Sequence, residues 1–181
     1  MKRCHWCNLA NPLYVTYHDQ EWGIANFQDP YLFEMLILES FQAGLSWETI
    51  LNKRVAFRQA YDHFNVDKVA QYGEDKVQEL IANPQIIRHP AKIRASIQNA
   101  QVLQNIQADY GSFYAYLTTF TQGKRWVELD KTSSPLSEAV SKGLKQKGMA
   151  FIGPTIIYSY LQACGIIYSH EKNCFLYRTE I

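Results

Sequence analysis

The sequence has little of what marks a secreted, membrane-embedded or disulfide-bonded protein. It contains only four cysteines in 181 residues. Its N-terminus lacks the apolar run of a signal peptide, and no stretch approaches the roughly 18 to 20 apolar residues of a membrane span. We therefore expect a cytoplasmic protein whose cysteines are buried or bind metal. The 47% hydrophobic content favours a single globular domain over residues 1–181, and we expect a monomer.

An excess of charge of one sign is also absent, because 18 basic side chains stand against 17 acidic ones and give a formal net charge of +1. This balance excludes a nonspecific polybasic coat for nucleic acid but permits a local basic face. Sustained alternation with a period of two is absent as well, so we predict an all-α fold. The predicted helices are 29 to a stop at Gly44, 46–64, 66–72, 74–82, a long helix from about Pro90, 110–120, 135–146 and 156–164.

The most informative stretch is the first of these helices. Asp29 suits its N-cap and Pro30 its first helical position. Glu39 then falls on a stripe of apolar residues, so its carboxylate is shielded from water if that stripe faces the core. A small rotation of the helix would instead place Glu39 at the wet margin. An isolated buried carboxylate is costly unless something pairs with it.

The turn after this helix adds two further features. Gly44 ends the helix and Ser46 can cap the next one, which leaves Leu45 at the tip of a tight turn. Trp47 begins the second helix. A shielded acid at Glu39, an apolar wedge and an aromatic platform are the parts of a pocket for a flipped nucleobase.

Both ends of the chain carry metal ligands. Cys4, Cys7 and His18 lie in an aromatic-rich N-terminal segment, and His170-x-x-x-Cys174 lies near the C-terminus. Two ligands from each end would complete a tetrahedral structural zinc site. Our preferred set is Cys4, His18, His170 and Cys174, although Cys4-x-x-Cys7 also has ligand spacing. The alternative is a group of unconnected cysteines and histidines.

A helix–hairpin–helix arrangement is predicted where one helix stops at Asn83-Pro84 and the next begins near Pro90. A helix N-terminus offers free N–H groups to a phosphate. An ordinary helix corner with surface cations is the alternative. The cations that suit phosphates are Arg88, Lys92 and Arg94 at the hairpin, and Lys142, Lys145 and Lys147 on a later helix. The basic side chains of the predicted helix 46–64, which are Lys53, Arg54 and Arg58, are interpreted as a solvated face.

A series of short motifs spans residues 3–174. In chain order they are Arg3-Cys4-x-Trp6, Tyr17-His18-Asp19-x-Glu21-Trp22-Gly23, Leu32-Phe33-Glu34-Met35 through Glu39, Gln42-Ala43-Gly44-Leu45-Ser46-Trp47, Ile86-Ile87-Arg88-His89-x-x-Lys92-Ile93, Phe151-Ile152-Gly153-x-Thr155, Tyr158-Ser159-x-x-Gln162-Ala163 and His170-x-x-x-Cys174. Together they resemble the bacterial DNA-3-methyladenine glycosylase I family.

The resemblance implies an all-α helix–hairpin–helix glycosylase fold. It implies a zinc ion that joins the two terminal segments through Cys4, His18, His170 and Cys174, with Cys7 outside the site. The implied reaction is hydrolysis of the N-glycosidic bond of 3-methyladenine in alkylated double-stranded DNA. It releases the free base and leaves an abasic site in base-excision repair.

The resemblance further implies that Glu39 reads the damaged base, with Tyr17 and Trp47 lining the pocket. Glu39 is also the candidate catalytic residue, and whether it acts on the attacking water stays open. We add Trp6, Tyr14 and Trp22 as candidate base-binding residues. The candidate DNA contacts are Gln42, Gly44, Leu45, Arg88, Lys92, Lys142 and Lys145.

Two positions depart from the family pattern. Gln85 stands where a hairpin glycine is usual, and Gly tolerates a positive φ that Gln adopts poorly. Tyr168-Ser169 replaces a more polar pair. Two other classes of function are compatible with the residues: a noncatalytic zinc-clasped module that reads DNA structure or a modified base, and a zinc-stapled protein-interaction domain. Release of free base from methylated DNA distinguishes all three.

Overall fold

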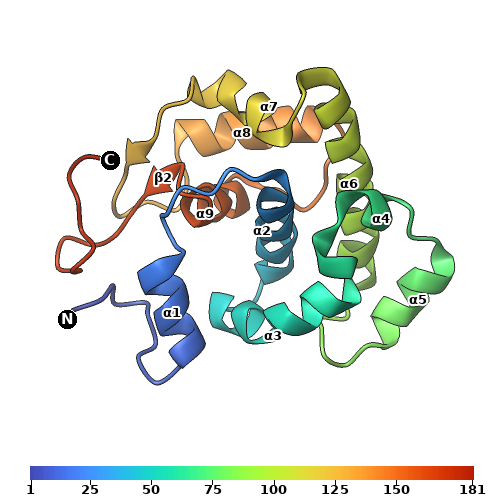
Figure 1. Ribbon diagram of the computed structural model, residues 1–181, viewed down its shortest axis with the longest axis horizontal. Helices are drawn as coiled ribbons and strands as arrows, with labels where there is room; N and C mark the ends of the chain where they lie inside the picture. Colours follow the sequence, from blue (N-terminus) through green and yellow to red (C-terminus); the bar gives the residue numbers. More distant parts are fainter.

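The computed structural model describes residues 1–181, and its architecture is helical, as predicted (Figure 1). The only strands form a two-residue parallel pair in which Trp126 aligns with Ile167 and Val127 with Tyr168. The elements in chain order are α1 (Pro12–Gln20), α2 (Asp29–Gln42), α3 (Trp47–Ala60), a 3₁₀ turn (Asp62–Phe64), α4 (Val66–Ala70), α5 (Glu74–Ala82), α6 (Pro90–Tyr110), α7 (Phe113–Thr121), β1 (Trp126–Val127), α8 (Pro135–Gln146), α9 (Pro154–Ala163) and β2 (Ile167–Tyr168).

Helix α2 lies at the centre of the molecule, packed against α3, α6, α7 and α9 (Figure 1). Every side chain from Leu32 to Phe41 is buried, so the helix is covered all round rather than along one stripe. This explains why its sequence is apolar on most faces. The burial also places Glu39 in the interior and excludes the wet-margin position, because its exposure is 3%.

The start of α2 differs from the expectation that Asp29 is its N-cap. The cap position is Gln28, which makes no side-chain capping bond, and Asp29 is the first helical residue. The Asp29 carboxylate instead accepts the backbone N–H groups of Phe113 and Tyr114, at 2.8 and 3.3 Å. Asp29 therefore accepts hydrogen bonds from backbone N–H groups that have no partner within α7, at the N-terminus of that helix, where a negative charge is favourable.

The turn between α2 and α3 has the predicted form. Gly44 adopts a φ of +84°, a conformation that favours glycine. Ser46 caps α3 by accepting the N–H of Thr49 at 3.2 Å. The predicted helix 46–64 is shorter than expected, because residues 62 to 64 have positive φ values that no α-helix continues through.

Helices α5 and α6 are joined by a turn at residues 83–89. His89 caps α6 by accepting the N–H of Lys92, and Pro90 follows it, as the sequence indicated. Gln85 is not among the residues with positive φ, so the missing glycine causes no strain there. The carbonyl of Gln85 accepts a hydrogen bond from Lys53 Nζ at 3.0 Å.

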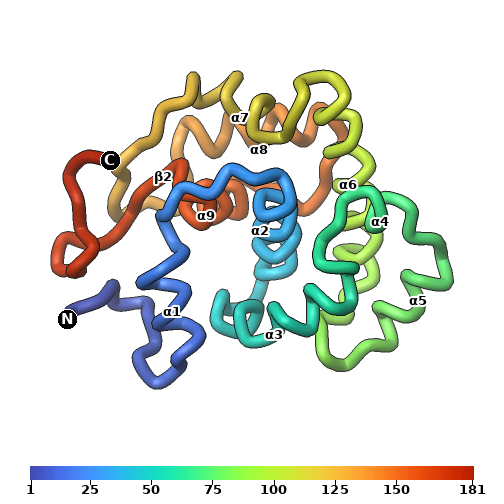
Figure 2. Tube along the Cα trace, in the orientation of Figure 1, coloured from blue at the N-terminus to red at the C-terminus, as the bar shows by residue number.

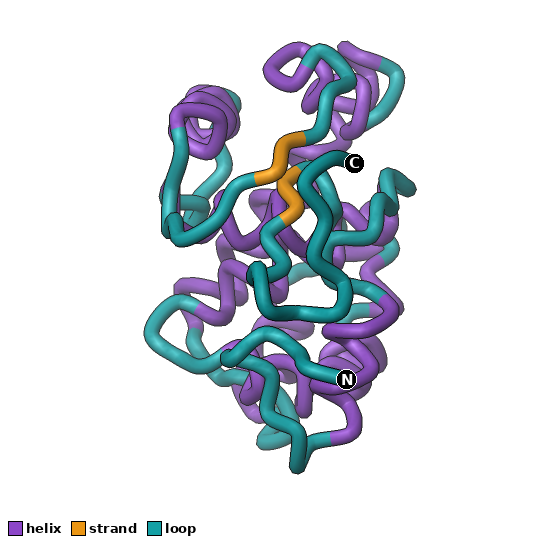
Figure 3. Tube along the Cα trace, turned by 90° about the vertical axis from the view of Figure 1, so that its left-hand side faces the viewer, coloured by secondary structure: helices purple, strands orange, loops and turns teal.

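The two terminal segments lie side by side, and the traces show both ends on the same side of the molecule (Figures 2 and 3). The N–H of Phe175 donates to the carbonyl of Lys2 at 2.8 Å. Helix α1, which the sequence analysis did not predict, begins at a capping Asn11 and carries the N-terminal aromatics inward. None of the helices combines the length and apolarity needed to cross a membrane.

Candidate functional site

A pocket of about 210 Å³ opens between α1, α2, α3 and α9. All six side chains predicted to bind a base line it, so the structure brings together residues from four separate parts of the sequence. Gln42, expected as a DNA contact, lines the same pocket. The complete lining is Trp6, Tyr14, Tyr17, Trp22, Glu39, Gln42, Trp47, Ser159 and Gln162.

Glu39 is the one carboxylate that lines this pocket. Its Oε2 is buried and has no hydrogen-bond partner. Burial raises the pKa of Glu39 to about 8, because an ion in a poorly hydrated site is unfavourable. A buried acceptor without a partner in an open pocket is suited to a ligand that brings a donor or a positive charge.

The walls of the pocket are aromatic rings in mutual contact. The ring centroids of Tyr17 and Trp47 are 5.3 Å apart, and those of Trp6 and Trp22 are 4.8 Å apart. Burial, followed by the charge of Glu39, raises the pKa of Tyr17, which therefore stays protonated. The Nε1 of Trp47 is a second buried polar atom without a partner. The pocket thus offers flat apolar faces for stacking and unpaired polar atoms for recognition.

A buried ion network supports these walls from behind. Arg54 is 7% exposed and donates to Glu21 at 2.8 Å and to Glu34 at 2.7 Å. Glu34 also accepts from Arg58 at 2.6 Å, and Tyr31 donates to Glu21 at 3.0 Å. The network joins the end of α1 to α2 and α3, which carry the two faces of the pocket. From the sequence these arginines were taken for a solvated face, and the structure corrects that interpretation.

Next to the pocket, the four preferred ligand residues form one buried cluster. The ligand atoms of Cys4, His18, His170 and Cys174 all lie within 4.8 Å of one another. The Sγ of Cys4 is 3.5 Å from His170 Nδ1, and the Sγ of Cys174 is 3.5 Å from His18 Nε2. Cys7 points elsewhere, with its Sγ 3.8 Å from the Tyr14 carbonyl. The arrangement can hold a metal ion.

The outward-facing atoms of the cluster are fixed by hydrogen bonds. His18 Nδ1 is 2.8 Å from an Asp19 oxygen, and His170 Nε2 is 3.2 Å from the Trp22 carbonyl. Such partners orient each imidazole so that its other nitrogen faces the cluster. Backbone N–H groups also donate to both sulfurs, from Glu171 to Cys4 and from Leu176 to Cys174, each at 3.4 Å. Donors of this kind favour thiolates.

Comparison with known proteins identifies the family. A family model described as methyladenine glycosylase matches residues 6–177. The chain belongs to the methyladenine glycosylase family. It is 40% identical over 184 residues to DNA-3-methyladenine glycosylase 1 of Escherichia coli (strain K12), covering 98% of this chain and 97% of that protein. The resemblance drawn from the motifs is confirmed.

Solved structures agree with the family assignment. A crystal structure of 3-methyladenine DNA glycosylase I has a TM-score of 0.93 at 39% identity, over 98% of this chain and all of that one. A tyrosine-to-phenylalanine variant of such an enzyme, in complex with 3-methyladenine, also has a TM-score of 0.93, at 34% identity over the whole of both chains.

Sequence reasoning missed two residues of this methyladenine glycosylase pocket, Ser159 and Gln162. They are three positions apart, share one face of α9 and line the pocket. Both belong to the Tyr158-Ser159-x-x-Gln162-Ala163 motif. The spacing of these two polar residues on an otherwise apolar helix is the signal that could have identified them.

The candidate DNA contacts occupy different environments. Leu45 is 42% exposed at the tip of its turn, next to Gly44. Arg88, Lys142 and Lys145 are exposed and form no ion pair, whereas Lys147 pairs with Asp109 at 3.2 Å.

Lys92 differs from the other candidate contacts. It is only 6% exposed, and its Nζ donates to the carbonyls of Phe41 and Ala43 at 3.0 and 2.7 Å. This ammonium faces the end of α2, whereas a phosphate contact requires it at the surface.

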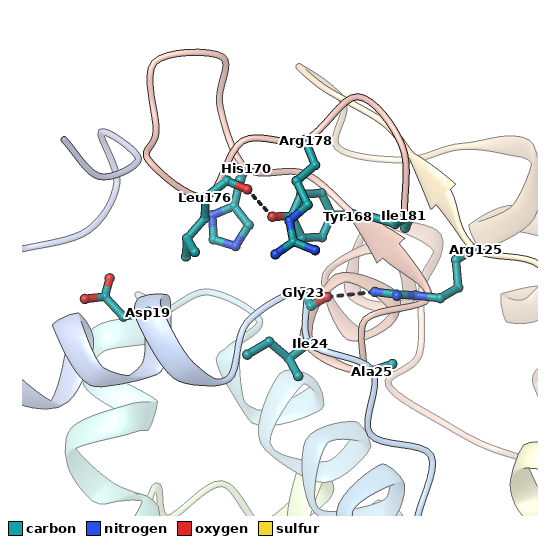
Figure 4. A pocket seen from close by; sticks show the side chains of 10 residues that line it. All are labelled: Asp19, Gly23, Ile24, Ala25, Arg125, Tyr168, His170, Leu176, Arg178 and Ile181. Carbon is teal, nitrogen blue, oxygen red and sulfur yellow. Dashed lines mark hydrogen bonds between the residues drawn. The ribbon is translucent and has the colours of Figure 1, made fainter. Parts of the chain in front are cut away.

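A larger cavity of about 440 Å³ borders the Cys/His cluster, because His170 of the cluster and Asp19, which bonds His18, both line it (Figure 4). Arg125 donates to the carbonyls of Gly23 and Gly165, and the Tyr168 hydroxyl donates to the carbonyl of Leu176. Most polar groups of this cavity therefore hold the terminal segments in place. The unpaired polar atoms that suit a base are in the smaller pocket.

Proposed function

We propose that this protein is a DNA glycosylase that hydrolyses the N-glycosidic bond of 3-methyladenine in alkylated double-stranded DNA. Relatives that match 98% and 95% of the chain are named for this activity, and a structure of similar fold is of an enzyme in complex with 3-methyladenine. The observation that carries the proposal is the unpartnered Glu39 oxygen inside an aromatic pocket. We also propose that residues 1–181 form one domain, since one continuous core includes residues from Cys4 to Cys174. That the protein acts as a cytoplasmic monomer stays a proposal from the sequence.

The pocket suits a base that has left the helical stack. Tyr17 and Trp47 provide faces against which a purine packs, and Trp47 provides an electron-rich face for a cation. Methylation at N3 makes the adenine cationic. The Glu39 carboxylate can accept hydrogen bonds from the adenine amino edge, and the nearby positive charge favours the ionised form of Glu39. Recognition of charge and of the donor pattern would then come from one residue.

The positive charge that N3 methylation gives the base also explains how the bond breaks. The cationic base is a good leaving group, and it takes the bonding electrons when the C1′–N9 bond breaks. The sugar becomes an oxocarbenium-like cation, to which water adds at C1′ with loss of a proton. Glu39 holds the leaving base in place during this step. The reaction gives free 3-methyladenine and an abasic site.

We propose that DNA is held by two separate parts of the surface. The turn at Gly44 and Leu45, with Gln42 beside it, fills the gap left by the flipped nucleotide, as apolar wedges do. The α5–α6 turn acts as a helix–hairpin–helix grip in which free N–H groups at the start of α6 contact a phosphate. Arg88, Lys142 and Lys145 are exposed, unpaired cations that can add further phosphate contacts.

We propose that the cluster of Cys4, His18, His170 and Cys174 binds one structural zinc ion. Two sulfurs and two imidazole nitrogens are a typical donor set for zinc, and four protein ligands leave no position for a reactive water. Burial raises the pKa of the Cys4 thiol to about 12, so a divalent cation is what would stabilise thiolates here. Zinc would join the terminal segments and so hold α1, with its pocket residues Tyr14 and Tyr17.

The decisive experiment measures release of free base from methylated duplex DNA by the purified protein. We expect free 3-methyladenine to appear with matching abasic sites in the DNA. A Glu39→Gln variant serves as the control for contaminating activity. If the protein binds methylated DNA without releasing base, it is a reader of modified DNA and the glycosylase proposal fails. If it neither binds DNA nor releases base, the protein-interaction alternative is favoured.

A further inference from the structure

The C-terminal end of α2 is capped by a side chain from another helix. Helix ends leave up to four carbonyls without partners, and α2 has no basic residue in its last turn. Lys92, in the first turn of α6, provides the donors through its two bonds to Phe41 and Ala43. Its positive charge lies at the end of α2 where the helix dipole is negative.

The segment that this cap holds is the wedge turn, residues 42–46. The N–H of Leu45 donates to the carbonyl of Gln42 at 2.7 Å. With the two bonds from Lys92, the three successive carbonyls of residues 41, 42 and 43 all have donors. The backbone that leads into Gly44 and Leu45 is therefore fixed from inside, although Leu45 itself projects into solvent.

Lys92 also belongs to the turn that joins α5 and α6. Its own N–H donates to the capping ring of His89 at 3.3 Å, so its backbone is part of the start of α6. One residue thus connects two surfaces that are distant in sequence. No carboxylate pairs with its ammonium, and a methionine of similar length would avoid the cost of burying that charge.

We propose that Lys92 is a positioning residue for base flipping. It sets the wedge turn relative to the α5–α6 hairpin, so that Leu45 enters the duplex at a fixed place when the hairpin holds the phosphates. The inference rests on the proposed glycosylase function. In this proposal Lys92 does not make the phosphate contact that the sequence suggested. It acts instead by fixing the backbone that carries Leu45.

The test is a double-mutant cycle of Lys92→Met and Leu45→Ala. The readout is binding to a duplex that contains a tetrahydrofuran abasic analogue, which needs the wedge but places no base in the pocket. We expect Lys92→Met to weaken this binding about tenfold when Leu45 is present, the size typical for bonds to a charged donor. In the Leu45→Ala background the same change should cost less than about threefold, because residues that act as a unit are not additive.

Three further measurements separate this role from a purely structural one. Binding of free 3-methyladenine to Lys92→Met should stay within about twofold of the parent, since pocket contacts do not use the wedge. Lys92→Arg keeps the charge and donors and should recover most of the duplex binding. Lys53→Met is the matched control. It removes an ammonium that donates to a backbone carbonyl, as Lys92→Met does, but this carbonyl belongs to Gln85 in the α5–α6 turn, so the wedge turn is left untouched.

Several results would overturn the proposal. Additive effects together with a salt slope lowered by about 1 would show a direct phosphate contact. Equal losses of duplex binding and free-base binding, with a lower melting temperature, would show a structural role only. If Lys92→Met does not fold, the cycle is run with Lys92→Gln, which removes the charge but keeps a donor, and additivity there counts against positioning. A parental protein that releases no 3-methyladenine would refute the proposed function, whereas this binding cycle would still report whether Lys92 acts through Leu45.

Discussion

The Cys/His cluster and the aromatic pocket around Glu39 are neighbours, because the ring centroids of Trp6 and His18 are 5.2 Å apart. The two regions nevertheless differ in whether their buried polar atoms have hydrogen-bond partners. In the cluster, each outward imidazole nitrogen is bonded within the protein, and each sulfur accepts a backbone N–H. In the pocket, Glu39 Oε2 and Trp47 Nε1 are buried without a partner.

This difference indicates what each region is for. A group of ligands whose outer bonds are already made is held in one geometry before any ion binds, and it contributes to stability. A pocket with unpaired polar atoms is less stable when empty, and the missing bonds are made by the ligand. Changes in the cluster should therefore reduce stability, and changes in the pocket should reduce activity while stability is kept.

The largest effect is expected when the cluster loses a ligand. Cys174→Ala should lower the free energy of unfolding by at least about 3 kcal/mol and the melting temperature by about 6 to 12 °C, because metal binding energy is folding energy here. Thermal melting and zinc content per chain are the measurements. Cys7→Ala is the matched control, since this buried thiol points away from the cluster. A Cys174 variant with a full complement of zinc and parental melting would contradict the structural role.

In the pocket, Glu39→Gln should reduce activity and leave stability unchanged or higher. The amide places a donor against the adenine amino group, and losing a charged hydrogen bond costs roughly 1.5 to 3 kcal/mol, or about 10- to 150-fold in excision rate. Stability should be kept or raised, because an amide cannot ionise, and the substitution removes a group whose ionisation is unfavourable in the folded protein. Excision of 3-methyladenine and thermal melting are compared with those of Glu48→Gln, a carboxylate on α3 that bonds Asn8 and Asn11 outside the pocket. Parental excision by the Glu39→Gln variant would place recognition elsewhere.

The pH dependence of stability sharpens this contrast. The pKa of Glu39 is about 8 in the folded protein, against an ordinary value of 4.5. Between these values the folded state keeps a proton that the unfolded chain has lost. The free energy of unfolding therefore falls as pH rises from about 4.5 to about 8, and levels off above. Thermal melting of the parent and of Glu39→Gln from pH 5 to 9 isolates this component, because the two proteins share every other titratable group.

The excision rate should follow the opposite course. The carboxylate is the form that accepts donors from the base, so kcat/KM of the parent should rise with pH towards 8, and the Glu39→Gln variant should show no such rise. If the melting difference between the two proteins does not change with pH, the pKa of Glu39 is not raised in the folded state.

The sequence was most informative where a residue type is unusual for its position. An acid on an apolar helix indicated Glu39, and ligand pairs at the two ends indicated the cluster, because few other roles suit such residues there. The helices were predictable for a similar reason, since their periodicity and capping residues are local. Gly44 and Ser46 define the wedge turn within a few positions of the chain.

Polar residues whose partners are distant in sequence could not be assigned. Asp29 caps a helix that begins more than eighty positions later, Arg54 pairs with two acids from other elements, and Lys92 bonds carbonyls about fifty positions earlier. Each was interpreted from its own neighbours, as an N-cap, a solvated cation or a phosphate contact. Periodicity predicts the face of a helix on which a side chain lies. It does not predict which distant group forms a hydrogen bond or ion pair with that side chain.

A smaller effect is expected at the wedge. Leu45→Ala should weaken binding to a lesion-containing duplex about tenfold, because less apolar surface fills the gap in the stack. Binding of free 3-methyladenine should be unchanged, since Leu45 does not line the pocket. Val55→Ala is a suitable control, because this exposed apolar residue of α3 lies outside the turn. Equal losses on duplex and free base would refute the wedge.

The smallest effects on DNA binding are expected from substitutions of the exposed cations. Unlike the polar groups of the two buried regions, these charges are screened by water and salt. Arg88→Ala and Lys142→Ala should each lower the slope of log binding constant against log salt by about 1, since one phosphate contact releases about one counterion. Base preference should not change, because phosphate contacts carry no sequence information. The binding constants are measured for undamaged and methylated duplexes at several salt concentrations, with Lys172→Ala as a control on the C-terminal segment. A variant that alters base preference while keeping the parental slope would show that its side chain acts through the pocket instead.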